Sequence, residues 1–219
     1  MKKIAILMAS IFILASLSGC VKKDREAPYL KVDFDGISSN GWYRSNVTVT
    51  VHAIDNKSGV KEIKYRTDGD IWRDYVMPVK IKESGEHLFE CYAKDKKGNM
   101  AYINKTLKID KIKPKISFQN FEAGHTYLWG RGKTTLRIPK DTMIIGSMDI
   151  NVNASDSLSG MQKVEFYLGD EMQFSDDSPP YSWHLGKTIG VYNITAIAYD
   201  IAGNENAITI PDVQIFIMR

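Results

Sequence analysis

The sequence predicts an all-β protein made of two tandem antiparallel β-sandwiches. The first observation is an internal repeat, because residues 47–65 (VTVTVHAIDNKSGVKEIKY) align with residues 148–166 (MDINVNASDSLSGMQKVEF) at an offset of 101 positions. The second is another repeated block, in which residues 85–99 align with residues 190–204 at an offset of 105. Two copies of one sequence unit predict two copies of one small fold.

Both copies alternate apolar and polar residues, as strands with one buried face do. Residues 47–51 read VTVTV, and residues 150–154 read INVNA. Dipeptides and tripeptides that favour turns separate these segments, at positions 68–69, 84–85, 97–99 and 202–204. Many short strands between such turns indicate a sandwich, and we find no helical periodicity after residue 20.

The N-terminal residues predict the signal peptide of a lipoprotein. A run of 14 uncharged residues, Ile4 to Leu17, follows two lysines, and it is shorter than the ~20 apolar residues of a membrane-spanning helix. The last residue of the run and the three that follow read Leu17-Ser-Gly-Cys20, which resembles a lipobox. That resemblance implies that Cys20 carries lipid, that the protein is exported, and that it is anchored at the cell membrane or cell surface. The alternative is a simple cleaved signal and an unrelated cysteine.

We divide the chain into a signal peptide at 1–19, a lipidated tether at 20–26, and sandwiches at 27–112 and 113–219. Two domains of about 100 residues are consistent with the length of 219 residues. The second unit has about 15 more residues than the first ahead of its first repeated block. This insertion contains Tyr127-Leu128-Trp129-Gly130-Arg131.

Composition and charge limit the possible functions. Hydrophobic residues make up 43% and charged residues 25% of the chain, as in ordinary folded domains. Loss of the two lysines in the signal peptide lowers the net charge from +3 to about +1. This balance gives no basic surface for nucleic acid. Cys91 alternates with polar neighbours and aligns with Ala196, so we expect a small buried core residue there.

The order of the motifs resembles bacterial and archaeal Ig-like domains. Each unit has a period-two strand, the pattern A-x-D-x-x-S-G, a further strand, and the pattern A-x-D-x-x-G-N. The first unit also carries Trp42-Tyr43, and the second carries KVEFY and PPYSW. The resemblance implies two tandem Ig-like sandwiches of the kind found in strings on secreted and surface-anchored proteins, where they serve as spacers, adhesins or accessory modules.

The recurring acids raise the question of a calcium site. In an Ig-like topology the loops that carry them lie at one end of each sandwich, which gives two sets of candidate ligands: Asp55, Asp95 and Asn99, and Asp156, Asp200 and Asn204. Calcium binds six to eight oxygens, so each set of residues would supply only some of the ligands that a site needs. The alternative, which we favour, is turn chemistry, with Asp bonding its own backbone and Gly-Asn shaping a hairpin. We therefore expect no cofactor.

Catalysis is not predicted. No pair of the four histidines has metal-ligand spacing, and neither nucleophile elbows nor phosphate-binding loops occur. His87 aligns with Tyr192, at the place where Ig folds hold a structural tyrosine. We expect no small-molecule substrate.

The insertion provides the candidate binding residues. Tyr127, Leu128, Trp129 and Arg131 have the composition of interface anchors, and the topology places them at the pole farthest from the lipid. The alternative is that the aromatic residues pack on the sandwich as an additional strand. We predict a non-catalytic module that binds a protein or glycan at the cell surface, with a structural spacer or envelope component as the alternative.

Overall fold

The computed structural model describes residues 23–130 and 141–218, and every regular element in those ranges is a β-strand. The protein is therefore all-β, as predicted. Cys20 and Arg131, two residues of the predicted sites, lie outside the described residues. Within these ranges the structure contains no helix that is long and apolar enough to cross a membrane.

The first sandwich pairs a three-stranded sheet with a six-stranded sheet. The smaller sheet has the order β1-β4-β7 and the larger one the order β2-β3-β9-β8-β5-β6. The strands are β1 (Tyr29–Asp35), β2 (Ser38–Ser39), β3 (Trp42–Tyr43), β4 (Val47–Ile54), β5 (Val60–Thr67), β6 (Arg73–Asp74), β7 (Val79–Ile81), β8 (Gly85–Asp95) and β9 (Met100–Ile109).

The second sandwich repeats this plan with a three-stranded sheet, β10-β13-β16, and a six-stranded sheet, β11-β12-β18-β17-β14-β15. The strands are β10 (Lys115–Phe118), β11 (Thr126–Leu128), β12 (Met143–Ile145), β13 (Met148–Ser155), β14 (Met161–Leu168), β15 (Glu171–Asp176), β16 (Tyr181–Leu185), β17 (Thr188–Asp200) and β18 (Glu205–Ile217). The predicted boundary at residues 112 and 113 falls between β9 and β10.

Most strand pairs are antiparallel, but each sandwich also contains parallel pairing. Strand β3 pairs in parallel with β9, and β12 pairs in parallel with both β11 and β18. In each domain the chain crosses from the small sheet to the large one after its first strand, and a strand that follows this crossing pairs in parallel with the last strand of the domain. The alternation of residues could not reveal this crossing, because a strand has the same pattern in either sheet.

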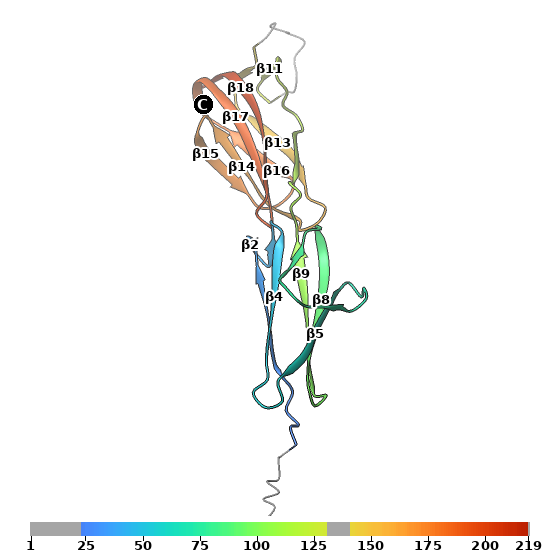
Figure 1. Cartoon of the computed structure of the whole chain (residues 1–219). Coiled ribbons are helices and arrows are strands. Elements are labelled where there is room, and N and C mark those ends of the chain that lie inside the picture. Colours follow the sequence, from blue (N-terminus) through green and yellow to red (C-terminus); the bar gives the residue numbers. More distant parts are fainter. Residues whose placement is uncertain (1–22, 131–140, 219) are drawn as a thin grey trace, which may run out of the picture.

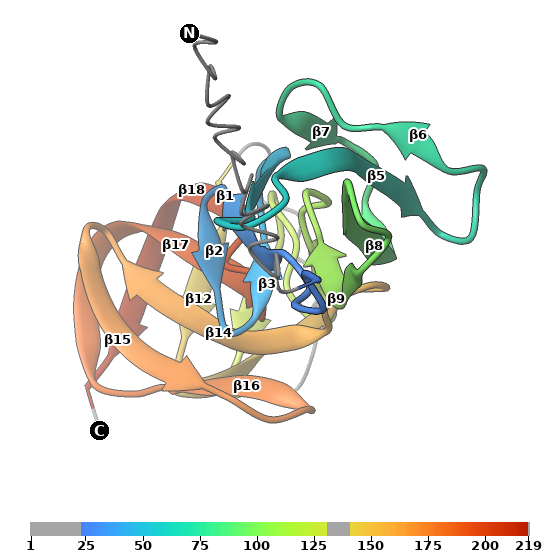
Figure 2. The same cartoon turned by 60° about the horizontal axis from the view of Figure 1, so that its bottom comes forward.

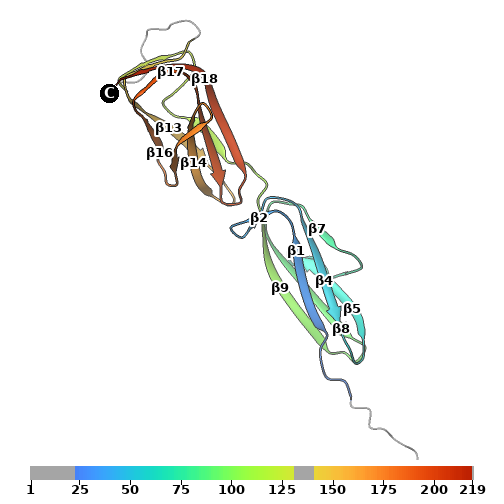
Figure 3. The same cartoon turned by 90° about the vertical axis from the view of Figure 1, so that its left-hand side faces the viewer.

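The two sandwiches lie end to end and form an elongated molecule (Figures 1 and 3). The described N-terminal segment is at the outer end of the first sandwich, and β11 is at the opposite end of the molecule. Figure 2 shows β5, β6 and β7 extending to one side of the first sandwich. Hydrogen bonds from Asn40 to the carbonyl of Ile201 (3.1 Å) and from Arg44 to that of Gly203 (2.6 Å) join the two domains.

Each domain has its own core between its two sheets. The alternating residues of β4 and β13 point inward as predicted, since Val47, Val49, Ile150 and Val152 are all buried. In the first core Phe89 stacks on Tyr65 with ring centroids 5.9 Å apart. These separate cores give each domain an independent source of hydrophobic stabilisation.

Candidate functional site

The insertion in the second domain divides its aromatic residues between the core and the surface. Tyr127 in β11 is fully buried and belongs to the core, whereas Leu128 is half-buried. The Tyr127 hydroxyl accepts a hydrogen bond from the backbone N–H of Glu122 (2.8 Å). Trp129, directly after the strand, is 66% exposed. Tyr127 is thus not available to a partner, and Trp129 is the exposed member of the predicted set among the described residues.

Trp129 lines a groove of about 440 Å³ at the end of the molecule away from the first domain. Its floor and walls come from β12, the turn after it and the end of β18, with lining residues Ile145, Gly146, Ser147, Phe216, Ile217 and Met218. Phe216 and Met218 are 46% and 74% exposed. The groove is therefore largely apolar and open to solvent, a composition suited to a partner with apolar surface.

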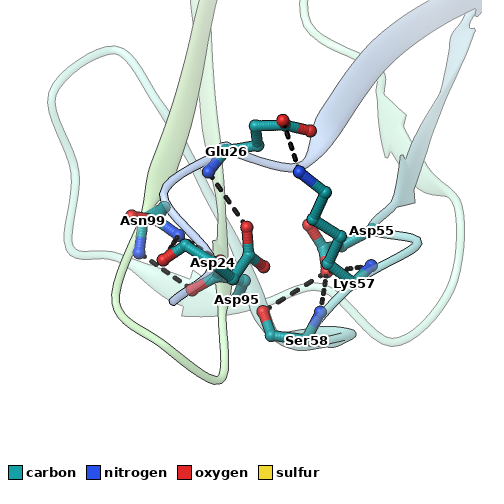
Figure 4. A network of polar contacts seen from close by, with 7 residues as sticks. All are labelled: Asp24, Glu26, Asp55, Lys57, Ser58, Asp95 and Asn99. Carbon is teal, nitrogen blue, oxygen red and sulfur yellow. Dashed lines mark hydrogen bonds and ion pairs between the residues drawn. The ribbon is translucent and has the colours of Figure 1, made fainter. Parts of the chain in front are cut away.

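Three carboxylates converge at the outer end of the first domain. Asp24, Asp55 and Asp95 each place an oxygen within 4.8 Å of the other two. Asp95 is fully buried, Asp24 is 7% exposed, and Asp55 is half-buried. Figure 4 shows the Asp24 side chain between the other two acids. The predicted pair Asp55 and Asp95 does come together, and the chain segment before β1 supplies a third acid.

Backbone hydrogen bonds hold these carboxylates in place. Asp55 Oδ1 accepts from the N–H groups of Ser58 (2.7 Å) and Gly59 (2.6 Å), which is the turn chemistry expected from the sequence. Asp24 Oδ1 accepts from the N–H of Glu26 (3.0 Å), and this bond holds the pKa of Asp24 below its ordinary value. The group therefore stays ionised at neutral pH although it is buried.

Asn99 acts as a donor to the cluster. Its side-chain nitrogen donates to Asp95 Oδ2 (2.6 Å), and its backbone N–H donates to Asp95 Oδ1 (2.8 Å). Burial favours the protonated form of Asp95, but the hydrogen bonds from Asn99 outweigh it and keep its pKa below the ordinary value. Asn99 thus orients an acid, and its amide nitrogen rather than its oxygen faces the cluster.

The second domain repeats the arrangement near the junction with the first. Asp110, Asp156 and Asp200 also place oxygens within 4.8 Å of one another, and Asp110 and Asp200 are fully buried. Asn204 donates to Asp200 Oδ2 (2.8 Å), as Asn99 does to Asp95. Burial raises the pKa of Asp200, and the charges of Asp110 and Asp156 raise it further, against the hydrogen bonds from Asn204.

Asp24 and Asp110 were not among the predicted site residues. Both lie outside the two repeated blocks, so the alignment that exposed the other acids did not include them. A signal was nevertheless present, because each acid precedes a proline by four positions, in Asp24-Arg-Glu-Ala-Pro28 and Asp110-Lys-Ile-Lys-Pro114. This recurrence ahead of the first strand of each domain places both acids beside the loops that carry the others.

The described histidines and the core cysteine contact structural partners. His87 Nδ1 lies 2.8 Å from Asp68 Oδ2, and its Nε2 lies 3.0 Å from the Glu83 carbonyl oxygen. His184 pairs with Asp149 across two strands at 2.7 Å. Cys91 is fully buried, and burial raises the pKa of its thiol to about 11. A thiol with such a pKa stays protonated at neutral pH and is a poor nucleophile.

Comparison with known proteins supports the class of fold. The family model described as a bacterial Ig domain matches residues 135–196, in the second of the two domains. No curated protein matches the chain.

Among solved structures, the chain is similar to the fibronectin(III)-like modules of Clostridium thermocellum CbhA, with 18% identity, 86% of this chain and 94% of that chain covered, and a TM-score of 0.47. It is also similar to a bacterial ice-binding adhesin of 1.5 MDa, with 11% identity, coverage of 89% and 67%, and a TM-score of 0.37. A third is the Bacteroides ovatus protein SGBP-B, with 11% identity, coverage of 87% and 47%, and a TM-score of 0.30.

Proposed function

We propose that this protein is a non-catalytic binding module of the cell surface, held by lipid at Cys20. The observation that carries the proposal is the open apolar groove at the end of the molecule opposite the described N-terminus, with Trp129 at its edge. A tether at the N-terminal end would direct this groove away from the membrane. Large exposed aromatic and apolar side chains are the usual anchors of binding sites.

The proposal includes a protein or glycan partner and no chemical reaction. Support comes from the Ig-like class of the domains and from the contacts of three residues: His87 and His184 each pair with an aspartate, and the thiol of Cys91 is buried in the first core. Exposed Trp129 could stack on a sugar ring or insert into an apolar pocket of a protein. The spacer function remains the alternative, in which the length of the two domains matters and the groove does not.

Photocrosslinking in the cell tests the groove against the spacer alternative. A photoreactive residue replaces Trp129 in one variant and Ile71 in the other. Ile71 is 72% exposed, on a loop of the first domain, and serves as a control of matched accessibility. We expect a specific adduct from position 129 and none from 71. Equal labelling from both positions, or none from either, would favour the spacer.

The lipid anchor is tested separately. Cys20→Ser is expected to shift the protein from the membrane fraction to the soluble fraction or to block its processing. Cys91→Ser is the matched control, because the side chain of Cys91 is buried in the first core. Retention of the Cys20→Ser protein in the membrane fraction would exclude lipid anchoring at this residue.

A further inference from the structure

We infer that the Asp24, Asp55 and Asp95 cluster binds one calcium ion. The first argument is geometric. Calcium lies about 2.3–2.6 Å from its oxygen ligands, so two ligands on opposite sides of one ion are at most ~5 Å apart. The three carboxylates place oxygens within 4.8 Å of one another, which allows all three to contact the same ion.

The second argument is an unpartnered oxygen. Asp24 is 93% buried, as its 7% exposure implies, and its Oδ2 has no hydrogen-bond partner. Figure 4 shows that this oxygen faces the space between Asp55 and Asp95. A buried carboxylate oxygen without a partner is costly, and a cation bound there removes that cost.

In the second domain, both carboxylate oxygens of the equivalent acid accept hydrogen bonds. Asp110, the equivalent of Asp24, uses Oδ1 to accept from the N–H of Ile112 (2.9 Å) and Oδ2 to accept from that of Ser159 (3.0 Å). In the first domain the corresponding N–H, that of Ser58, instead donates to Asp55 Oδ1 (2.7 Å). Asp24 Oδ2 is thereby left facing the other acids, so the inference is confined to the first domain.

Among the described residues, no lysine or arginine forms an ion pair with any of the three acids. Lys57, on the loop of Asp55, forms its ion pair with Glu26, outside the three acids. The hydrogen bonds that orient the acids come from neutral donors, the N–H groups of Glu26, Ser58 and Asn99 among them. The charge of Lys57 partly offsets those of Asp24 and Asp55, but three preoriented carboxylates still favour a hard divalent cation with oxygen ligands.

A bound ion would link three separate parts of the chain: the segment before β1, the β4–β5 loop and the β8–β9 hairpin. It would fix the N-terminal segment to the outer end of the first domain. Extracellular calcium modules typically have Kd values of ~0.1–1 mM, and we expect binding in or somewhat below that range.

The test is equilibrium dialysis of the full chain, purified in detergent and stripped with a chelator, against CaCl₂ up to ~10 mM free ion, well above the weakest extracellular sites. Asp24→Asn keeps the shape of the side chain, and we expect the number of calcium ions bound per chain to fall by one. Asp35→Asn, which removes an exposed acid of β1, is the control of equal charge change and should bind as the unaltered protein does.

Absence of calcium binding to the unaltered chain overturns the inference, and so does unchanged stoichiometry in Asp24→Asn. Magnesium binding as tight as that of calcium overturns the choice of ion. If Asp24→Asn does not fold, amide exchange on the unaltered protein decides the matter. Calcium should then slow exchange at Glu26, Gly59 and Asn99, whose N–H groups bond to the three acids. Equal exchange at these amides with and without calcium rejects the site.

Discussion

Trp129 lies against Gly146, and the two residues fit only because position 146 has no side chain. A Cβ placed on Gly146 would lie 2.9 Å from Cγ of the indole and closer still to other ring atoms. Gly146 has φ of +81°, which residues with a side chain rarely adopt. The turn after β12 thus leaves room for the indole ring to pack against its backbone, while most of the indole remains exposed to solvent.

Trp129 and Tyr127 should respond in opposite ways to truncation. Trp129→Ala removes an exposed side chain, so we expect a change of less than ~1 kcal/mol in the free energy of unfolding, together with weaker capture of the partner. Tyr127→Ala leaves a cavity in the core and should cost ~3–5 kcal/mol. Thermal denaturation and the crosslinking yield measure the two effects. A large loss of stability in Trp129→Ala would assign the indole to the core and favour the spacer.

These two residues also show why the sequence could not resolve the insertion. They are two positions apart, and the period-two rule places such residues on one face of a strand. Trp129 has φ of 46°, in the left-handed region, and so the chain turns as β11 ends. This single backbone angle sends Tyr127 inward and Trp129 outward, and nothing in the composition of the segment specifies it.

The repeat, in contrast, predicted the two sandwiches well, because alternation over residues 47–51 and 150–154 depends only on which face of each strand is buried. It also identified two acids of each cluster, since Asp55 and Asp95 recur as Asp156 and Asp200. It missed the third acid, which tertiary folding brings in from outside the repeated blocks. A cluster assembled from three loops leaves no continuous sequence pattern.

Glu90 should make the stability of the first domain depend on pH in the acid range. Its hydrogen bonds with Arg66 (2.6 and 2.9 Å) and then with Tyr102 lower the pKa of its carboxyl group. A lowered folded-state pKa gives stability that is complete above the unfolded value, about 4.3, and is lost as the pH falls through the folded value. Glu90→Gln should therefore lose less stability on acidification below about pH 4.3 than the unaltered protein does.

Urea denaturation at a series of pH values measures this effect. Arg66→Gln removes the partner and should reduce the acid dependence in the same way. If the unaltered protein and both variants lose stability in parallel as the pH falls, the ion pair does not contribute to the acid dependence of stability.

His87 should have the opposite pH dependence. Burial favours the neutral imidazole, but the hydrogen bonds to Asp68 and to the Glu83 carbonyl outweigh it and raise the pKa of His87 above 6.5. A raised folded-state pKa gives stability that is complete below the unfolded value, about 6.5, and is lost as the pH rises through the folded value. The destabilisation by His87→Gln should thus be largest below pH ~6.5 and shrink above it.

Asp68→Asn provides the partner variant for this prediction. Asparagine tolerates the positive φ of 56° at this position, and its carbonyl oxygen can still accept from the N–H of Leu88. We expect its destabilisation to fade over the same pH range. Direct titration of His87 by NMR adds an independent measurement, and a value at or below 6.5 would contradict the assignment.

The two domains should fold independently. The hydrogen bonds from Asn40 and Arg44 across the junction come from exposed residues, and such bonds add little stability in water. Each domain also has its own core. Residues 23–109 and 110–219, a division that keeps Asp110 with the cluster of the second domain, should each show a β-type circular dichroism spectrum and a cooperative thermal transition when expressed separately. The melting temperature of each half should lie close to that of its transition in the full chain.

Arg44→Ala in the full chain is the matched test of the junction, and it should leave both transitions in place while broadening the distribution of interdomain distances in small-angle scattering. A half that is unfolded alone but folded in the full chain would show that the domains depend on each other.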